Sequence, residues 1–253
     1  MLVYRQFGKR DSGYSLIFLH GSTMKKESML PIVEWFQEYN CIVPDLSHHG
    51  ESSGNMPASI EDIARDVEET IANLQRENIV QGKVVLLGYS MGGAITYEVA
   101  LRNKVKVDGI VFLSSGADLK HHTPLVEQLK NISSKRFSTK NIVDYLFGTL
   151  AGEQEQEEIS RMFLENSVEN QTGYNDLMIS NAYDRLEDVK EIQVPTLLVH
   201  GCDDKIVLPS AAIDTWKQIA DSQLLMVPYG GHALIFENPA LVSQRVKGFV
   251  ERI

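Results

Sequence analysis

Cysteine is almost absent from this sequence: only Cys41 and Cys202 occur among its 253 residues. Two cysteines cannot form a disulfide framework, and they lack the paired spacing that a structural zinc site needs. Each one borders an apolar run, so we expect both to be small buried hydrophobic residues. Because 43% of the residues are hydrophobic, a chain of this length can bury a large core without cross-links.

Long hydrophobic runs and an excess of positive charge are also missing. No apolar run approaches the roughly 20 residues of a membrane-spanning helix, and residues 1–15 lack the apolar stretch of a signal peptide. We therefore expect a cytoplasmic protein with no membrane span. The 34 acidic residues outnumber the 24 basic ones, which gives a formal net charge of −10. This charge disfavours nucleic acid and anionic membranes as partners, because their phosphates attract lysine and arginine.

What the sequence does contain is a regular alternation of strand-like and helix-like segments. Six nearly continuous apolar runs, typical of strands covered on both faces, begin at Ser15, Cys41, Lys83, Gly109, Pro195 and Gln223. Helical periodicity marks residues 59–78, 90–103 and 239–253, and Ser59 is placed to cap the first of these helices. The alternation predicts an α/β fold with a mostly parallel central sheet and helices on both faces.

One interval breaks this alternation. Residues 118–183 lie between two predicted strands and are far longer than an ordinary connection. Helical patterns cover 124–132, 141–150, 153–170 and 174–189, so the interval is not a disordered loop. We predict an inserted helical cap at 118–183 and an α/β core made of 1–117 and 184–253.

A Gly-x-Ser-x-Gly sequence follows the run that begins at Lys83. Gly88 and Gly92 flank Ser90 at the junction of a predicted strand and a predicted helix. A sharp turn there lifts the serine hydroxyl out of the sheet edge, in front of a helix N-terminus, where it can attack a carbonyl. The motif alone also fits a glycine-rich packing turn, so the interpretation depends on finding a base for the hydroxyl.

His232 and Asp204 supply the base and its carboxylate in this hypothesis. His232 lies in a glycine-rich segment after the last predicted strand, and Asp204 follows the strand before it. Loops after parallel strands share one edge of the sheet, so we expect both side chains beside Ser90. The chain order serine, aspartate, histidine is the order expected on this kind of fold. Asp203 and Asp118 are alternative carboxylates for the same role.

An oxyanion hole is predicted from main-chain groups. The backbone N–H of Met91, directly after the serine, is one expected donor. The other is the backbone N–H of Ser22, in the turn after the run that begins at Ser15. Because both donors belong to the main chain, we expect the side chains of Ser22 and Met91 to matter little.

Together these segments resemble the α/β-hydrolase superfamily, in particular its single-domain members with a helical cap. The resemblance covers nearly the whole chain and rests on HGS at His20, DLSHHGESSG at Asp45, GYSMGG at Gly88, GCDDKIV at Gly201 and GGHALIFENP at Gly230. It implies that Ser90 is the nucleophile, His232 the base and Asp204 the acid that orients it. The second segment departs from the usual D-L-P-G-H-G-x-S pattern, because Ser47 and His48 replace its proline and glycine.

The function expected from these features is a carboxylesterase-type serine hydrolase that cleaves a small ester or acyl compound. Carbon–carbon bond hydrolysis, peptide hydrolysis and perhydrolase chemistry are alternatives on the same triad, and a slowly turning over ligand receptor or signalling protein is an alternative of another class. We expect no cofactor or metal: the histidine pairs 48/49 and 121/122 lack an acidic residue at metal-motif spacing. The oligomeric state stays open.

Overall fold

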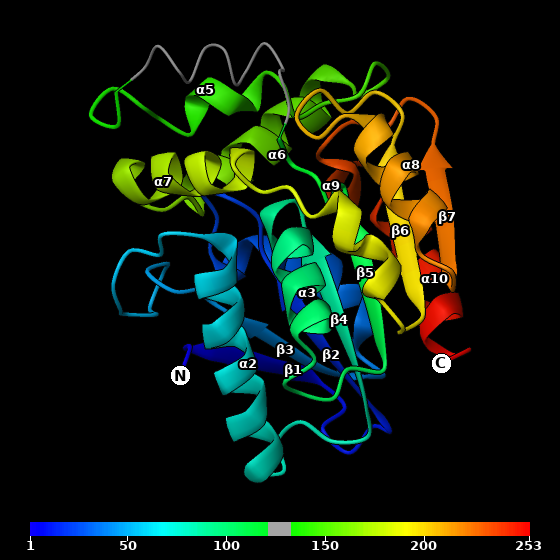
Figure 1. Ribbon diagram of the computed structural model, residues 1–253. Helices are drawn as coiled ribbons and strands as arrows, with labels where there is room; N and C mark the ends of the chain where they lie inside the picture. Colours follow the sequence, from blue (N-terminus) through cyan, green and yellow to red (C-terminus); the bar gives the residue numbers. More distant parts are fainter. Residues whose placement is uncertain (121–132) are drawn as a thin grey trace.

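The computed structural model describes residues 1–120 and 133–253 (Figure 1). Within these ranges seven strands form one sheet in the order β1-β3-β2-β4-β5-β6-β7. β1 pairs antiparallel with β3, and all the other pairings are parallel. The strands are β1 (Tyr4–Gly8), β2 (Tyr14–Leu19), β3 (Asn40–Pro44), β4 (Lys83–Tyr89), β5 (Gly109–Leu113), β6 (Thr196–Gly201) and β7 (Ser222–Val227).

The predicted α/β class with a mostly parallel sheet is confirmed, and each of the six apolar runs contains a strand. The sequence patterns missed β1. All of its residues are exposed or half-buried, because it is an antiparallel edge strand that pairs with β3 alone. A short strand with a polar face lacks the continuous apolar run that marks the buried strands.

Helices cover both faces of the sheet, and alternate residues of each strand point to opposite faces. In β2, Ile17 and Leu19 pack with the helices α2 and α3, whereas Leu16 and Phe18 pack with α1 and α10. The helices outside the interval 118–183 are η1 (Lys26–Met29), α1 (Leu30–Val33), η2 (Glu34–Phe36), α2 (Ile60–Arg76), α3 (Met91–Arg102), η3 (Leu186–Glu191), α8 (Pro209–Gln218), α9 (Leu234–Glu237) and α10 (Pro239–Val250). None of the described helices is long and apolar enough to cross a membrane.

The helix α2 forms where the periodicity placed it. Its buried face includes Ile63, Val67 and Ile71, at the three- and four-residue spacing of a helix stripe. Ser59 is the N-cap: its side chain accepts a hydrogen bond from the Asp62 N–H at 3.3 Å. The predicted cap residue and the predicted apolar face are therefore both confirmed.

The interval 118–183 carries α5 (Lys140–Val143), α6 (Glu153–Glu165) and α7 (Asn170–Asn181), which lie over the carboxyl ends of the strands (Figure 1). The helix predicted at 141–150 is wrong beyond Val143, because the chain turns there so that the Gly148 N–H can donate to Glu237. The pattern at 174–189 is divided: α7 begins earlier and ends at Asn181, and η3 is separate. The helix predicted at 124–132 lies outside the described residues.

The two cysteines differ in environment. Cys41 lies in β3 and is buried, as expected, and burial raises the pKa of its thiol to about 12. The expectation for Cys202 is wrong: its side chain is exposed. Cys202 follows the last residue of β6, where the chain leaves the covered sheet and begins a turn. The apolar run therefore predicted burial correctly up to Gly201, but not for the next residue, Cys202.

Candidate functional site

Ser90 occupies a tight turn between β4 and α3. Its backbone has φ 52° and ψ −119°, a left-handed conformation that is unusual for a residue with a side chain. The turn brings backbone so close that a Cβ on Gly88 would lie 2.1 Å from the Gly92 carbonyl O, and one on Gly92 would lie 2.2 Å from the Leu19 carbonyl O. The two glycines of the motif are therefore required by close approach of the main chain.

His232 lies between Ser90 and Asp204, as the sequence hypothesis placed it. Its Nε2 is 3.0 Å from Ser90 Oγ and its Nδ1 is 2.8 Å from Asp204 Oδ2. All three residues are more than 90% buried. A carboxylate can only accept, so the proton of a neutral His232 stands on Nδ1, which leaves Nε2 free to accept from the serine hydroxyl.

Of the three candidate carboxylates, it is that of Asp204 that meets His232. Its Oδ1 accepts from the N–H groups of Ile206 and Val207, at 2.9 and 3.0 Å, and these bonds fix the carboxylate in the turn after β6. Asp203 is half-buried and meets another partner: its Oδ2 accepts from the N–H and hydroxyl of Thr149. Those hydrogen bonds from Thr149 lower the pKa of Asp203.

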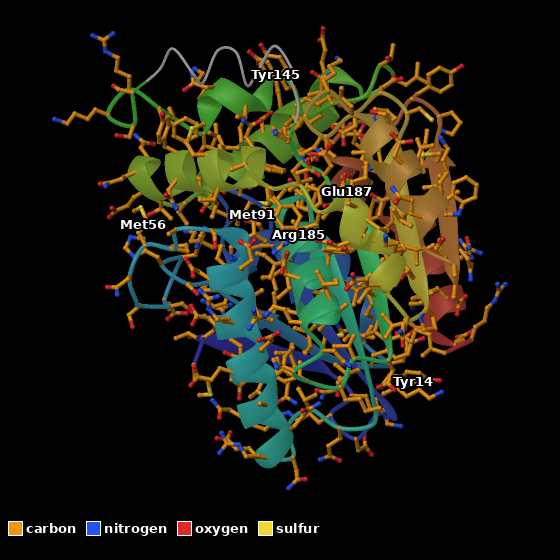
Figure 2. The ribbon with its side chains drawn as sticks, in the orientation of Figure 1. Tyr14, Met56, Met91, Tyr145, Arg185 and Glu187 are labelled. Atoms are coloured by element: carbon orange, nitrogen blue, oxygen red, sulfur yellow. The ribbon has the colours of Figure 1, made fainter. Side chains whose placement is uncertain are left out.

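Both predicted oxyanion donors lie beside Ser90. Met91 is the first residue of α3, and Figure 2 shows it at the end of that helix, beneath α7. Ser22 follows Gly21. The Gly21 backbone lies so close to Ser90 that a Cβ on Gly21 would be 3.2 Å from Ser90 Cβ. Within the described ranges, the N–H groups of Ser22 and Met91 donate to no other described residue. Both donors are thus free to bind a ligand oxygen.

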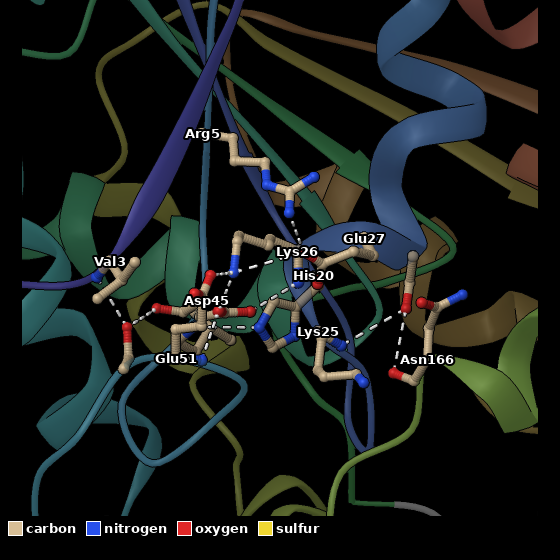
Figure 3. Close-up of polar contacts among 12 residues, drawn as sticks. Val3, Arg5, His20, Lys25, Lys26, Glu27, Asp45, Glu51 and Asn166 are labelled. Atoms are coloured by element: carbon tan, nitrogen blue, oxygen red, sulfur yellow. Dashed lines mark hydrogen bonds and ion pairs between the residues drawn. The ribbon is translucent and has the colours of Figure 1, made fainter.

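The loop that carries Ser22 is anchored by a charge cluster in which Lys26 and Asp45 are buried and Glu51 is exposed, shown in Figure 3. The Lys26 ammonium binds the carboxylates of Asp45 and Glu51, and Asp45 also accepts from the Lys26 N–H at 2.8 Å. Burial opposes the charge of Lys26, but Asp45 and Glu51 outweigh it and raise its pKa. This cluster ties the end of the loop, at Lys26, to the end of β3.

His20, directly before Gly21, is a neutral part of the same anchor. Its Nε2 accepts from the Leu46 N–H at 3.0 Å, and its Nδ1 lies 3.0 Å from the Gly21 carbonyl O (Figure 3). Burial, together with the nearby His49, lowers the pKa of His20 to about 3. With its proton on Nδ1, a neutral His20 donates to the Gly21 carbonyl O and accepts from the Leu46 N–H. The hydrogen-bond geometry therefore agrees with the lowered pKa of His20.

A cavity of about 60 Å³ opens in front of Ser90. Its wall is mostly apolar, with side chains from the sheet edge and from α5, α6 and α7, among them Ile142, Leu146, Phe163, Leu177 and Ile206. Asn181 and Ser180 add polar groups, and the buried Oδ1 of Asn181 has no hydrogen-bond partner among the described residues. Apart from His232, the described wall contains no acidic or basic side chain.

The sequence patterns did not single out two residues that hold His232. The Tyr89 hydroxyl donates to the His232 carbonyl O at 3.1 Å. The Glu237 carboxylate accepts from the Gly231 N–H at 2.8 Å and from the Gly148 N–H at 2.9 Å. Glu237 belongs to the segment GGHALIFENP, so an acidic residue shortly after the histidine was the available signal. Burial raises the pKa of Glu237.

The described part of the chain contains no group of three or more histidine, cysteine or acidic residues that could hold a metal ion. His48 and His49 diverge: His48 Nδ1 lies 3.2 Å from the Gly54 carbonyl O, whereas His49 Nε2 lies 2.9 Å from Asp176 Oδ2. The pair 121/122 lies outside the described residues. His48 has φ 65°, the region that favours the glycine usual at this position of the pattern.

The seven-stranded sheet with its covering helices is the α/β-hydrolase fold, and it is shared with solved esterase structures. A lipase-esterase related protein from Clostridium acetobutylicum has a TM-score of 0.87 and 26% identity, over 98% of this chain and 99% of that one. The chain belongs to the family described as "Serine aminopeptidase, S33", whose model matches residues 12–239.

Curated relatives point to the same class of chemistry. Lipase 1 of Psychrobacter immobilis is 26% identical over 98% of this chain and 80% of its own length. A pimeloyl-[acyl-carrier protein] methyl ester esterase of Nitrosospira multiformis is 26% identical over 90% of each chain. The protein is a serine hydrolase of the α/β-hydrolase superfamily, with esterases and lipases among its relatives.

Proposed function

We propose that the protein cleaves small carboxylic esters through an acyl-enzyme on Ser90, with His232 as the base and Asp204 as the carboxylate that orients it. The observation that carries this proposal is the hydrogen-bonded path from the Ser90 hydroxyl through His232 to Asp204, which opens on an apolar cavity. Esterases and lipases among the relatives support ester chemistry.

The reaction follows from these positions. Ser90 Oγ attacks the ester carbonyl while His232 Nε2 takes the hydroxyl proton. Asp204 holds the imidazole in one tautomer and stabilises the imidazolium as it forms. The backbone N–H groups of Ser22 and Met91 receive the oxyanion. His232 then protonates the leaving alcohol, and a water activated by the same histidine releases the acid and restores Ser90.

We propose further that residues 118–183 act as a cap over an α/β core of 1–117 and 184–253. The ends of this segment meet, because Asp118 and Asp184 form an isolated β-bridge and the Leu119 N–H donates to the Tyr183 carbonyl O at 3.0 Å. Its helices supply much of the apolar cavity wall. Substrate selectivity is therefore assigned to this segment.

The proposal is tested with p-nitrophenyl esters of graded acyl length. The cavity is small, so we expect acetate and butyrate to be turned over. Octanoate should have at least about tenfold lower kcat/KM, because forcing its longer chain against the packed wall costs about 1.4 kcal/mol or more. Absence of turnover on all esters, in a protein that still reacts with a fluorophosphonate at Ser90, would favour the receptor alternative.

Peptide and carbon–carbon bond hydrolysis find less support in the cavity. An aminopeptidase of this fold needs a carboxylate to bind the substrate amine, and a carbon–carbon bond hydrolase needs a cation to hold a substrate carboxylate. Neither is present in the described wall. Amino-acid p-nitroanilides are therefore included in the ester screen, and we expect no turnover of them.

Asn181 is expected to favour acyl groups that carry a hydroxyl. Its buried Oδ1 lacks a donor, and a substrate hydroxyl can supply one. The matched substrates are p-nitrophenyl esters of β-hydroxybutyrate and isovalerate, which differ by a hydroxyl in place of a methyl group. Asn181→Leu should lower the ratio of their kcat/KM values by about tenfold, the effect of one lost hydrogen bond to a buried group. An unchanged ratio would remove Asn181 from substrate recognition.

A further inference from the structure

Thr23 follows the predicted oxyanion donor Ser22, and the segment that carries α7 holds both of its backbone polar groups. The Thr23 N–H donates to Asp176 Oδ2 at 2.8 Å, and its carbonyl O accepts from the Val168 N–H at 2.9 Å. A third contact joins Ser22 Oγ to Ser180 Oγ at 3.3 Å. Thr23 has φ 66°, and such a conformation persists only where the surroundings fix it.

The Asp176 carboxylate that holds Thr23 also meets His49 from the core. His49 Nε2 lies 2.9 Å from Asp176 Oδ2, and His49 Nδ1 lies 2.8 Å from the Ser47 carbonyl O. A carbonyl and a carboxylate are both acceptors, so the imidazole satisfies both contacts only when both of its nitrogens carry protons. His49 and Asp176 therefore form an ion pair, and both side chains are fully buried.

Stability alone does not explain the buried ion pair of His49 and Asp176. Burying two charges is costly, and an apolar pair of similar volume is often as stable. The cost is higher here because Asp176 Oδ1 has no hydrogen-bond partner in the described part of the chain. What the pair does provide is a fixed acceptor for the Thr23 N–H, one residue from Ser22.

We propose that Asp176, held in place by His49, is a positioning residue that sets the Ser22 N–H for the oxyanion. The inference rests on the proposed esterase function. It makes the oxyanion loop dependent on α7, because without Asp176 the Thr23 N–H loses its acceptor and the left-handed turn loses a restraint. The Lys26 cluster fixes only the other end of this loop.

Asp176→Leu tests this role, because it keeps the branched shape of the side chain and removes the oxygen that accepts from the Thr23 N–H. We expect kcat for p-nitrophenyl butyrate to fall about tenfold to a hundredfold, while KM stays within about twofold, since a misplaced oxyanion donor weakens transition-state binding and not substrate binding. The Ki of butylboronic acid, which forms a tetrahedral adduct on the serine, should rise by the same factor. His49→Gln should give the same pattern, and it serves as the second variant if Asp176→Leu folds poorly.

The matched control is Arg102→Met, which breaks the ion pair between Arg102 and Glu68 far from Ser90. It should lower the melting temperature and leave kcat and the boronate Ki unchanged. An unchanged kcat in a folded Asp176→Leu protein overturns the inference, as does an equal loss of kcat in the control. Lack of ester turnover by the unmodified protein is a separate result, because it removes the proposed function instead.

A second readout is the pH dependence of stability. The groups that face His49 are Asp176 on α7, Asp45 after β3 and His20 after β2. Burial opposes the imidazolium, but Asp176 outweighs it and raises the pKa of His49. The stabilisation by the pair is therefore complete below about pH 6.5, the ordinary histidine value, and is lost as the pH rises through the folded-state pKa. The difference in unfolding free energy between the unmodified protein and His49→Gln should therefore become smaller as the pH rises. A difference that does not change with pH would mean that His49 is not charged in the folded protein.

Discussion

Replacing Ser90 by alanine is expected to lower kcat for p-nitrophenyl butyrate by about 10⁴- to 10⁶-fold, because no acyl-enzyme can then form. The residual rate would come from binding and from the main-chain donors alone. The fold should persist: the Ser90 backbone is held by the Leu113 carbonyl O and by the Ser115 hydroxyl, and alanine keeps both contacts. Steady-state kinetics and a melting curve on the same preparation measure the two effects.

Ser22→Ala is the matched control for this experiment. It removes a serine hydroxyl from the same cavity but leaves the main-chain N–H, so kcat should stay within about threefold, the loss of one weak hydrogen bond. If Ser90→Ala kept more than about a tenth of the activity, well above the loss expected for a nucleophile, the serine mechanism would be wrong.

Asp204→Asn is expected to lower kcat by about 10³- to 10⁴-fold, with little change in KM. An asparagine amide turned toward His232 Nδ1 donates to it, which favours the tautomer with its proton on Nε2. That tautomer cannot accept the Ser90 proton. The Ile206 and Val207 N–H groups keep an oxygen of the side chain facing them, and this leaves the amide nitrogen toward the imidazole.

The neighbouring Asp203→Asn provides a control with the same chemical change. Asp203 is half-buried and binds Thr149, with no contact to His232 among the described hydrogen bonds. Its kcat should stay within about twofold, as for a surface substitution outside the site. Equal losses of kcat in the two variants, or a larger loss in Asp203→Asn, would mean that Asp204 is not the carboxylate that orients His232.

Much of the fold follows from local patterns, because strands covered on both faces must be apolar throughout. The runs that became β2 to β6 could be found for this reason. The edge strand β7 is mostly half-buried but has an apolar sequence, whereas the edge strand β1 keeps a polar face. The interval 118–183 was harder. Its helix ends are set by tertiary contacts such as that of Gly148 with Glu237, which leave no periodic signal.

The candidate site was predictable where a short motif imposes a backbone shape. Gly88, Ser90 and Gly92 form such a motif, and the order of strands places His232 at the same edge. Asp203 and Asp204 are neighbours in one turn. The spacing of the motif favours Asp204 for the orienting role, but it does not exclude Asp203. His49 and Asp176 lie 127 residues apart, so no local pattern could have joined them.

The measurement that tests the central claim most directly is mass spectrometry of the protein after reaction with a fluorophosphonate. The account predicts a single adduct on the peptide that contains Ser90, no adduct in Ser90→Ala and a much slower reaction in Asp204→Asn. An adduct on another residue, or none on the unmodified protein, would contradict the assignment of Ser90 as the nucleophile.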